Sequence, residues 1–143
     1  MDAMVNRVVC FDIGGVLAHL RPTWRECAAA AGLDWSDALD RLDAGRLELF
    51  AAYQSGALGT DQYLASLSEL LGGLQRADAI AVHEAILLGP VQGTEVIVDG
   101  LRAQGTLTGC LSNTNELHWQ ILRFGGQFPA IHPRLTASCH LIR

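Results

Sequence analysis

The stretch Arg7-Val8-Val9-Cys10-Phe11-Asp12-Ile13-Gly14-Gly15 decides the fold of this 143-residue chain, because an unbroken apolar run ends there on one carboxylate and two glycines. An unbroken run, in contrast to an alternating one, is typical of a strand that is covered on both faces of a parallel sheet. The two glycines allow the backbone to approach an anionic ligand closely. The stretch therefore predicts a buried strand that delivers Asp12 into a tight loop.

A second strand of the same kind is predicted about a hundred residues later. Leu107 to Leu111 form the apolar run, and the polar sequence Ser112-Asn113-Thr114-Asn115 follows it directly. A helix that Thr94 is expected to cap precedes this strand, and Asn115 is expected to open another helix. This β-α-β order predicts parallel strands, whose carboxyl ends collect ligands, and both Asp12 and Ser112 would lie there.

The region between the two strands is predicted to be entirely helical. After a loop over residues 16–21, helices are expected from Pro22 to Gly32, from Asp34 through Leu42, from Arg46 to Tyr53, from Thr60 through Leu71 and from Ala77 to Leu88. Gly89-Pro90 then marks the return of the chain to the sheet. The sequence therefore predicts an α/β core over residues 1–20 and 90–143, with a helical segment inserted at residues 21–89.

The two loop sequences after the strands together resemble the first two motifs of the haloacid dehalogenase-like superfamily. Most members of that superfamily are phosphatases that work through an aspartyl-phosphate. The spacing of the two motifs resembles the subgroup with an α-helical cap after the first strand, and within it the glucose-1-phosphatase-type enzymes. The resemblance implies a Rossmann-like parallel sheet with a helical cap.

The resemblance also implies roles for particular residues. Asp12 would be the nucleophile and a Mg²⁺ ligand, and the backbone carbonyl of Gly14 a second ligand. The phosphate oxygens would be held by the backbone N–H groups of Ile13, Gly14 and Gly15, the hydroxyl of Ser112 and the N–H of Asn113. Mg²⁺ would offset the repulsion between carboxylate and phosphate, which costs roughly 4 kcal/mol per pair of unit charges at about 4 Å and an effective dielectric constant of about 20.

Position 14 departs from the pattern of most phosphatases in the family, which carry there a second Asp that protonates the leaving group. This chain has Gly14, a variant that also occurs in members resembling working phosphatases. Dehalogenases tend to carry a bulky aromatic residue at this position, so that activity is not expected. His19 is the nearest alternative proton donor, although a solvated loop histidine is the simpler interpretation. His118 is expected on a helix surface, away from Ser112.

Two further motifs of the family, one with a Lys and one with acids, have no counterpart in the sequence. All ten basic residues are Arg, and the last acidic residue is Glu116. Residues 134–143 resemble the family's third strand, so the chain is expected to be truncated just before the third motif. Two hypotheses follow: a Mg²⁺-dependent phosphatase of small phosphorylated metabolites, or an inactive form that acts as a binding or assembly module. In the second case a homodimer or a missing C-terminal segment would cover the exposed edge of the first strand.

Composition argues against some classes of binding partner and favours one cellular location. The net charge of −5, without a cluster of basic residues, argues against nucleic acids and anionic membranes as partners. The N-terminus lacks a signal pattern and no stretch of about 18 apolar residues occurs, so the cytoplasm is the expected location. Half of the residues are apolar, which predicts surface that another chain or segment covers. Cys10, Cys27, Cys110 and Cys139 are expected to be buried thiols.

Overall fold

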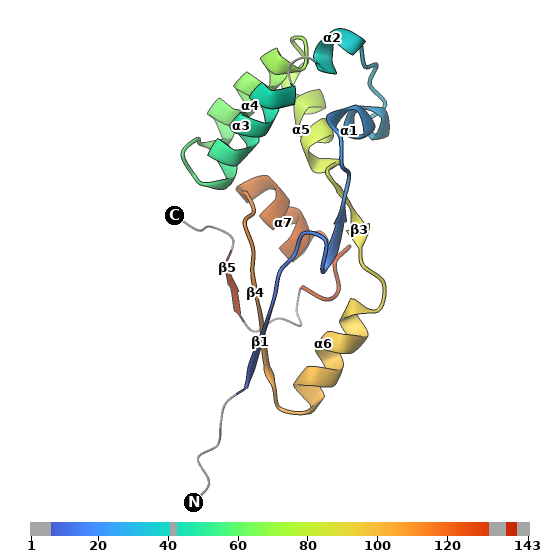
Figure 1. Ribbon diagram of the computed structural model, residues 1–143, viewed down its shortest axis with the longest axis vertical. Coiled ribbons are helices and arrows are strands. Elements are labelled where there is room, and N and C mark those ends of the chain that lie inside the picture. The colour runs from blue at the N-terminus through green and yellow to red at the C-terminus, as the bar shows by residue number, and fades with distance from the viewer. Residues whose placement is uncertain (1–6, 41–42, 132–136, 140–143) are drawn as a thin grey trace, which may run out of the picture.

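The computed structural model describes residues 7–40, 43–131 and 137–139, which form a sheet with two helices and a separate group of five helices (Figure 1). We call the first part the sheet unit; it contains β1 (Val8–Phe11), β4 (Leu107–Leu111), β5 (Ala137–Cys139), α6 (Thr94–Ala103) and α7 (Glu116–Phe124). The second part, the helical unit, lies beyond the carboxyl ends of the strands (Figure 1). Among the described helices, none has both the length and the apolar character needed to cross a membrane.

The three strands of the sheet unit are parallel, in the order β1-β4-β5. In the first pair Val8 lies opposite Leu107 and Phe11 lies opposite Cys110. The connection through α6 before β4 produces this parallel pairing, since antiparallel neighbours would need only a short turn. The α/β class and the Rossmann-like arrangement predicted from the sequence are therefore confirmed. The third predicted strand is present as β5, and the rest of residues 134–143 lies outside the described residues.

The prediction that the first strand is covered on both faces is wrong. Val8 is 63% exposed and Cys10, which was expected to be buried, is exposed, so the face of β1 that carries these two side chains is not covered by the described residues. Cys27 and Cys110 are buried as expected. Burial raises the pKa of the Cys27 thiol to about 11, so this thiol stays protonated at neutral pH.

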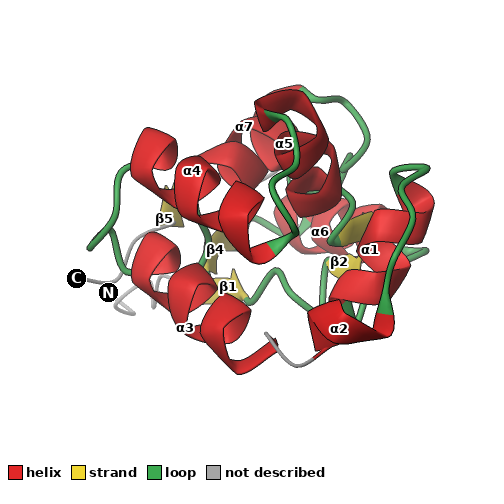
Figure 2. Cartoon of the chain, turned by 90° about the horizontal axis from the view of Figure 1, so that it is seen from above, coloured by secondary structure: helices red, strands yellow, loops and turns green. Residues whose placement is uncertain are grey.

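The helical unit consists of α1 (Trp24–Ala30), α2 (Asp37–Asp40), α3 (Asp43–Gln54), α4 (Thr60–Leu70) and α5 (Arg76–Glu84). Figure 2 looks down on these helices, with β1 and β4 visible between α3 and α4. Tyr63, Leu64 and Leu67 recur at the spacing of one helix face in α4 and are fully buried in a hydrophobic cluster of the helical unit. The sheet unit buries a cluster of its own around Ile13, so each part has a separate core.

The structure contains two short strands that the sequence did not predict. Residues 16–21 were expected to be a loop, and the helix from Ala77 was expected to reach Leu88. Instead, β2 (Ala18–Leu20) pairs antiparallel with β3 (Leu87–Pro90), and α5 ends at Glu84. The chain enters and leaves the helical unit along this pair (Figure 1). Local periodicity could not reveal β3, because its hydrogen-bond partner lies about seventy residues earlier.

Several helix starts differ from the predictions by one to three residues; α3, for example, was expected from Arg46 and begins at Asp43. The N-caps of α4 and α6 are Gly59 and Gly93, so Thr60 and Thr94 are the first helical residues. Helix α1 begins after Thr23, whose hydroxyl accepts a hydrogen bond from the Glu26 N–H at 3.2 Å. Helix α2 begins three residues after Asp34, and residues 41–42, in its predicted last turn, lie outside the described residues. The prediction that Asn115 opens α7 is confirmed.

A buried arginine fixes three helices of the helical unit. Arg46 of α3 is fully buried, and its guanidinium donates to the backbone carbonyls of Leu39 at 2.5 Å and Leu70 at 3.2 Å. The guanidinium also lies 4.9 Å from the centre of the Trp35 ring. Because Leu70 is the last residue of α4, its carbonyl has no partner within the helix. Arg46 therefore joins α2, α3 and α4 through groups that would otherwise lose hydrogen bonds.

Candidate active site

The predicted nucleophile and the predicted phosphate-binding hydroxyl lie at the same edge of the sheet. Asp12 directly follows the last residue of β1, and Ser112 directly follows the last residue of β4. Because Phe11 pairs with Cys110, the two segments leave adjacent parallel strands that lie about 4.8 Å apart. The pairing of β1 with β4 thus brings together two loops that are a hundred residues apart in the sequence.

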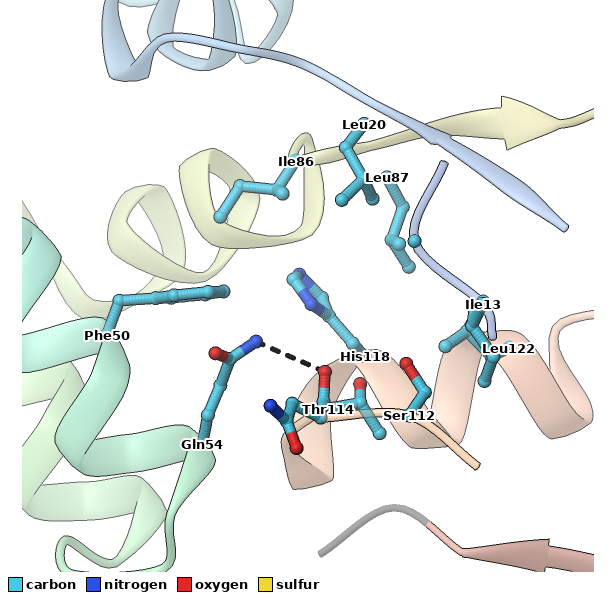
Figure 3. A pocket seen from close by; sticks show the side chains of 12 residues that line it. Ile13, Leu20, Phe50, Gln54, Ile86, Leu87, Ser112, Thr114, His118 and Leu122 are labelled. Atoms are coloured by element: carbon cyan, nitrogen blue, oxygen red, sulfur yellow. Dashed lines mark hydrogen bonds between the residues drawn. The ribbon is translucent and has the colours of Figure 1, made fainter. Parts of the chain in front are cut away.

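A pocket lies between this edge and the helical unit (Figure 3). It encloses about 330 Å³ of space, including its opening to solvent. Its lining comes from both parts of the molecule and consists of Ile13, Gly14, Leu20, Phe50, Gln54, Ile86, Leu87, Ser112, Asn113, Thr114, His118 and Leu122. Four of the predicted site residues are therefore together in one pocket: Ile13, Gly14, Ser112 and Asn113.

The other two predicted site residues, Asp12 and Gly15, are not among the lining residues. The Asp12 side chain is exposed, and its Oδ1 accepts a hydrogen bond from the Ile13 N–H at 2.7 Å. The Gly15 N–H donates to the carbonyl of Ala18 at 2.8 Å, in a turn where Gly15 has a φ of 75° that favours glycine. Two of the four amides expected to hold phosphate, those of Ile13 and Gly15, thus take part in hydrogen bonds of the loop itself.

The residues expected to bind Mg²⁺ offer a small set of oxygen ligands. Asp12 presents an exposed carboxylate, and no hydrogen bond within the described part of the chain uses the carbonyl oxygen of Gly14. No group of three or more His, Cys, Asp or Glu side chains suited to a metal occurs in the described residues. Mg²⁺ commonly keeps several water ligands and takes only one or two carboxylates together with substrate phosphate. The Asp12 carboxylate and the Gly14 carbonyl fit that mode of binding.

Sequence reasoning missed the part of the pocket that comes from the helical unit. Phe50 and Gln54 are one helical turn apart on α3 and both point into the pocket (Figure 3). The Gln54 side chain donates from Nε2 to the backbone carbonyl of Asn113 at 3.4 Å. The i, i+4 spacing of Phe50 and Gln54 was visible in the sequence, but only the tertiary fold directs this face of α3 toward the loop after β4.

His118 is buried, so the prediction that it lies on a helix surface is wrong. It is 4% exposed, lines the pocket and belongs to a hydrogen-bonded row of four buried side chains. The Tyr63 hydroxyl lies 2.7 Å from Nδ1 of His83, and Nε2 of His83 lies 3.1 Å from Oδ1 of Asn115. Nδ2 of Asn115 lies 3.2 Å from Nδ1 of His118, and Nε2 of His118 lies 2.9 Å from the carbonyl of His83.

The partners in this row determine the donors and acceptors. Nε2 of His118 faces a carbonyl and must donate, so its Nδ1 accepts from the amide of Asn115. Nε2 of His83 donates to Oδ1 of Asn115, and the Tyr63 hydroxyl donates to Nδ1 of His83. Each imidazole then carries one proton and is neutral. Burial lowers the pKa of His118 to about 4, and burial together with the neighbouring His118 lowers the pKa of His83 well below 6.5.

Neither histidine near the site is arranged as a proton donor for a leaving group. Both ring nitrogens of His118 already have partners in the buried row. His19 lies on β2, is exposed and is not among the lining residues of the pocket. Among the described residues, none that lines the pocket is a lysine or an arginine, so the polar groups they offer are neutral side chains and backbone dipoles.

Comparison with solved structures identifies the fold, although no family model and no curated protein matches the sequence. The HAD family enzyme BT-2542 from Bacteroides thetaiotaomicron superposes with a TM-score of 0.75 at 18% identity, covering 96% of this chain and 68% of that one. The chain has the fold of the HAD hydrolases. A second structure of BT-2542, in complex with magnesium and inorganic phosphate, superposes with a TM-score of 0.73 at 17% identity. That match covers 94% of this chain and 68% of that one.

A third HAD structure, described as a predicted HAD-like family hydrolase from Porphyromonas gingivalis, superposes with a TM-score of 0.69 at 21% identity. The match covers 94% of this chain and 65% of that one, so the chain spans about two thirds of the length of these HAD structures. The superposition of structures thus gives the same fold that the two sequence motifs predicted.

The buried histidine pair predicts that stability depends on pH near neutrality. The pKa values of both histidines are lower in the folded chain than the ordinary value of 6.5, so below about pH 6.5 the unfolded chain binds protons that the folded chain does not. The free energy of unfolding therefore has its full value, as far as these two histidines are concerned, above pH 6.5. It decreases toward pH 4 by up to about 1.4 kcal/mol per pH unit for each histidine.

Urea unfolding at pH 7, 6 and 5 measures this slope. The double variant Tyr63→Phe/His83→Phe removes one of the two histidines together with the hydroxyl that pairs with it, and should show about half the slope. An unfolding free energy that stays constant from pH 7 to pH 5 would contradict the neutral, buried state of the pair.

Proposed function

We propose that this protein is a Mg²⁺-dependent hydrolase that removes phosphate from a small phosphorylated metabolite, with Asp12 as the nucleophile. The observation that supports it is the placement of Asp12 and Ser112 at the carboxyl ends of adjacent parallel strands, at the edge of the sheet where Ser112 and the residue after Asp12, Ile13, line one pocket. The fold adds support, since a solved structure with the same fold binds magnesium and inorganic phosphate. A small substrate is favoured because the pocket is small: about 330 Å³ already includes its opening to solvent.

In this proposal the Asp12 carboxylate attacks the phosphorus atom, the bond from phosphorus to the ester oxygen breaks, and the leaving oxygen takes its proton from water. Water then hydrolyses the aspartyl-phosphate and restores the carboxylate. The hydroxyl of Ser112 and the backbone N–H of Asn113 donate hydrogen bonds to the phosphate oxygens. The carboxylate of Asp12 and the carbonyl of Gly14 would hold Mg²⁺, which supplies the positive charge that the pocket lining lacks.

The first prediction from this proposal concerns Asp12. Asp12→Asn keeps the size of the side chain but removes the anionic nucleophile, so turnover of a panel of sugar phosphates with Mg²⁺ should fall by at least about 10³-fold. Asp34→Asn, at an exposed residue of the helical unit, is the matched control and should leave turnover unchanged. Phosphatase activity that survives in the Asp12 variant, or that survives removal of Mg²⁺ by a chelator, would rule out the proposed mechanism.

Position 14 explains why the chain lacks the usual proton donor. A Cβ atom at Gly14 would lie 3.1 Å from Cδ1 of Leu20, which is closer than an ordinary carbon contact. Leu20 belongs to β2, lines the same pocket and is 45% exposed, so its side chain has room to move. The backbone at Gly14 does not have a positive φ, so sterics with Leu20 are the constraint on a larger residue there.

Gly14→Asp should therefore supply the missing general acid. We expect turnover of substrates with poor leaving groups to rise by about 10²-fold, the lower end of what general acid catalysis contributes. Gly14→Asn has nearly the same shape and no acidic proton, so it is the matched control and should give no gain. Adding Leu20→Ala to Gly14→Asp removes the close contact and should keep the gain. The same rate in the Asp and Asn variants would show that leaving-group protonation is not limiting.

We propose assembly through β1 as the alternative function, with a second copy of this chain as the partner. The support is the position of β1 at the edge of the described sheet, where backbone groups of an edge strand are open to pairing. Val8 of β1 is 63% exposed, and Leu107 opposite it on β4 is 49% exposed. Such exposed apolar side chains, on the edge strand and on its neighbour, favour burial against another sheet.

Sedimentation equilibrium tests this assembly. A dimer is expected at micromolar concentration, and Val8→Lys should shift it toward monomer because a charge on an edge strand opposes strand pairing. Val96→Lys, a change of the same kind at an exposed residue of α6, is the control and should leave the dimer intact. A wild-type chain that stays monomeric at tens of micromolar would exclude the alternative.

A further inference from the structure

Several hydrogen bonds between the two units, among the described residues, meet on one short segment, residues 113–118. Four of them join helices α3 and α5 to this segment: Gln54 Nε2 to the Asn113 carbonyl, the Leu117 N–H to the Tyr53 hydroxyl, His83 Nε2 to Asn115 Oδ1, and His118 Nε2 to the His83 carbonyl. The segment begins two residues after β4 ends and includes Asn113 of the predicted phosphate-binding set. The helical unit is therefore attached to the part of the sheet unit that carries the candidate site.

Asn115 is the centre of these contacts. It is fully buried, and its Oδ1 accepts from the His118 N–H at 3.0 Å and from Nε2 of His83 at 3.1 Å. Its Nδ2 donates to Nδ1 of His118 at 3.2 Å. The first of these bonds caps α7, and the second crosses to α5 in the helical unit. The Asn115 side chain thus has a defined orientation, which the neighbouring unit helps to determine.

The loop that would hold the phosphate is short and fixed at both ends. Its residues, Ser112 to Thr114, all line the pocket. On one side the loop continues from β4, which pairs with β1 and β5. On the other side it continues into Asn115. Because only three residues separate the two fixed points, we expect a change in the orientation of Asn115 that moves its backbone to shift the Ser112 hydroxyl or the Asn113 N–H as well.

We propose that His83, by its hydrogen bond to Asn115, positions the loop 112–114 for phosphate binding. This inference rests on the proposed phosphohydrolase function. His83 is a positioning residue, since it is fully buried and is not among the residues that line the pocket. The donor on the helical unit and the acceptor on the sheet unit are both neutral, so the bond can form in a buried site without the cost of a buried charge.

The surroundings of His83 allow its hydrogen bond to be removed without loss of packing. Its ring lies against the rings of Phe50, Tyr53, Tyr63 and His118, at centroid distances of 5.7, 5.9, 5.1 and 4.1 Å. Phenylalanine has nearly the shape of histidine and packs well among aromatic rings. His83→Phe alone would leave the buried Tyr63 hydroxyl without its partner, which is destabilising in itself. Tyr63→Phe removes that hydroxyl.

The test therefore compares Tyr63→Phe with Tyr63→Phe/His83→Phe. The single variant keeps the bond from His83 to Asn115, and the double variant removes it, while both have a filled aromatic cluster. Replacing both partners of a buried hydrogen bond by apolar groups can be nearly neutral for stability. Equal melting temperatures of the two variants would show that any further difference between them is not a loss of folding.

Two measurements are made on each variant. Amide hydrogen exchange reports the order of residues 113 and 114, and we expect faster exchange in the double variant than in the single one. Titration with inorganic phosphate in the presence of Mg²⁺ reports the site, and we expect the affinity of the double variant to be weaker by roughly tenfold, the effect of misplacing about one hydrogen-bond donor. Turnover should change mainly through KM.

The exchange measurement does not require that the protein bind phosphate, so the inference and the proposed function can fail separately. Equal exchange of the loop amides in the two variants would overturn the positioning role, whatever the activity. Faster exchange with unchanged phosphate affinity would also overturn it, since the loop would then move without effect on the site. A wild-type chain that binds no phosphate and hydrolyses no phosphate ester would instead refute the proposed function.

Discussion

The parallel pairing of β1 with β4 is the constraint on which the rest of the structure depends. It is a ladder of only four residue pairs, from Val8 with Leu107 to Phe11 with Cys110. It decides that the loop after Phe11 and the loop after Leu111 open at the same edge of the sheet. A shift by one residue in this register would turn every side chain of β1 to the opposite face and separate the two loops. The register of these strands therefore brings the parts of the candidate site together, and polar contacts only refine their positions.

Features carried by local sequence could be predicted, and features that depend on distant partners could not. Apolar periodicity predicts the helices α4 and α7, and for α7 the cap at Asn115 predicts the start as well. The loops at Asp12 and Ser112 are visible because a carboxylate or a hydroxyl follows an apolar run. In contrast, Leu87 and Leu88 were expected at the end of a helix, whereas they belong to β3, which pairs with the distant β2. His118 looks like a surface residue of a helix until α5 packs over it.

The same distinction applies to the exposure of the first strand. Its unbroken apolar sequence is typical of a strand covered on both faces, yet Val8 and Cys10 are exposed in the described part of the molecule. Sequence patterns report the environment for which a strand is suited and do not report whether that environment is present. The solved structures with this fold are about half as long again as this chain, so they contain residues with no counterpart in it.

The antiparallel pair of β2 and β3 places the entrance and the exit of the helical unit side by side, with Ala18 opposite Pro90 and His19 opposite Gly89. A segment whose two ends meet in this way adds little strain to the chain that carries it, because closing the loop depends only weakly on its length. The helices between these strands could thus be exchanged for a longer or shorter set while the sheet keeps its register. At the pair of β2 and β3, evolution or a protein engineer could therefore replace the helices that cover the pocket without changing the strands and loops of the sheet unit.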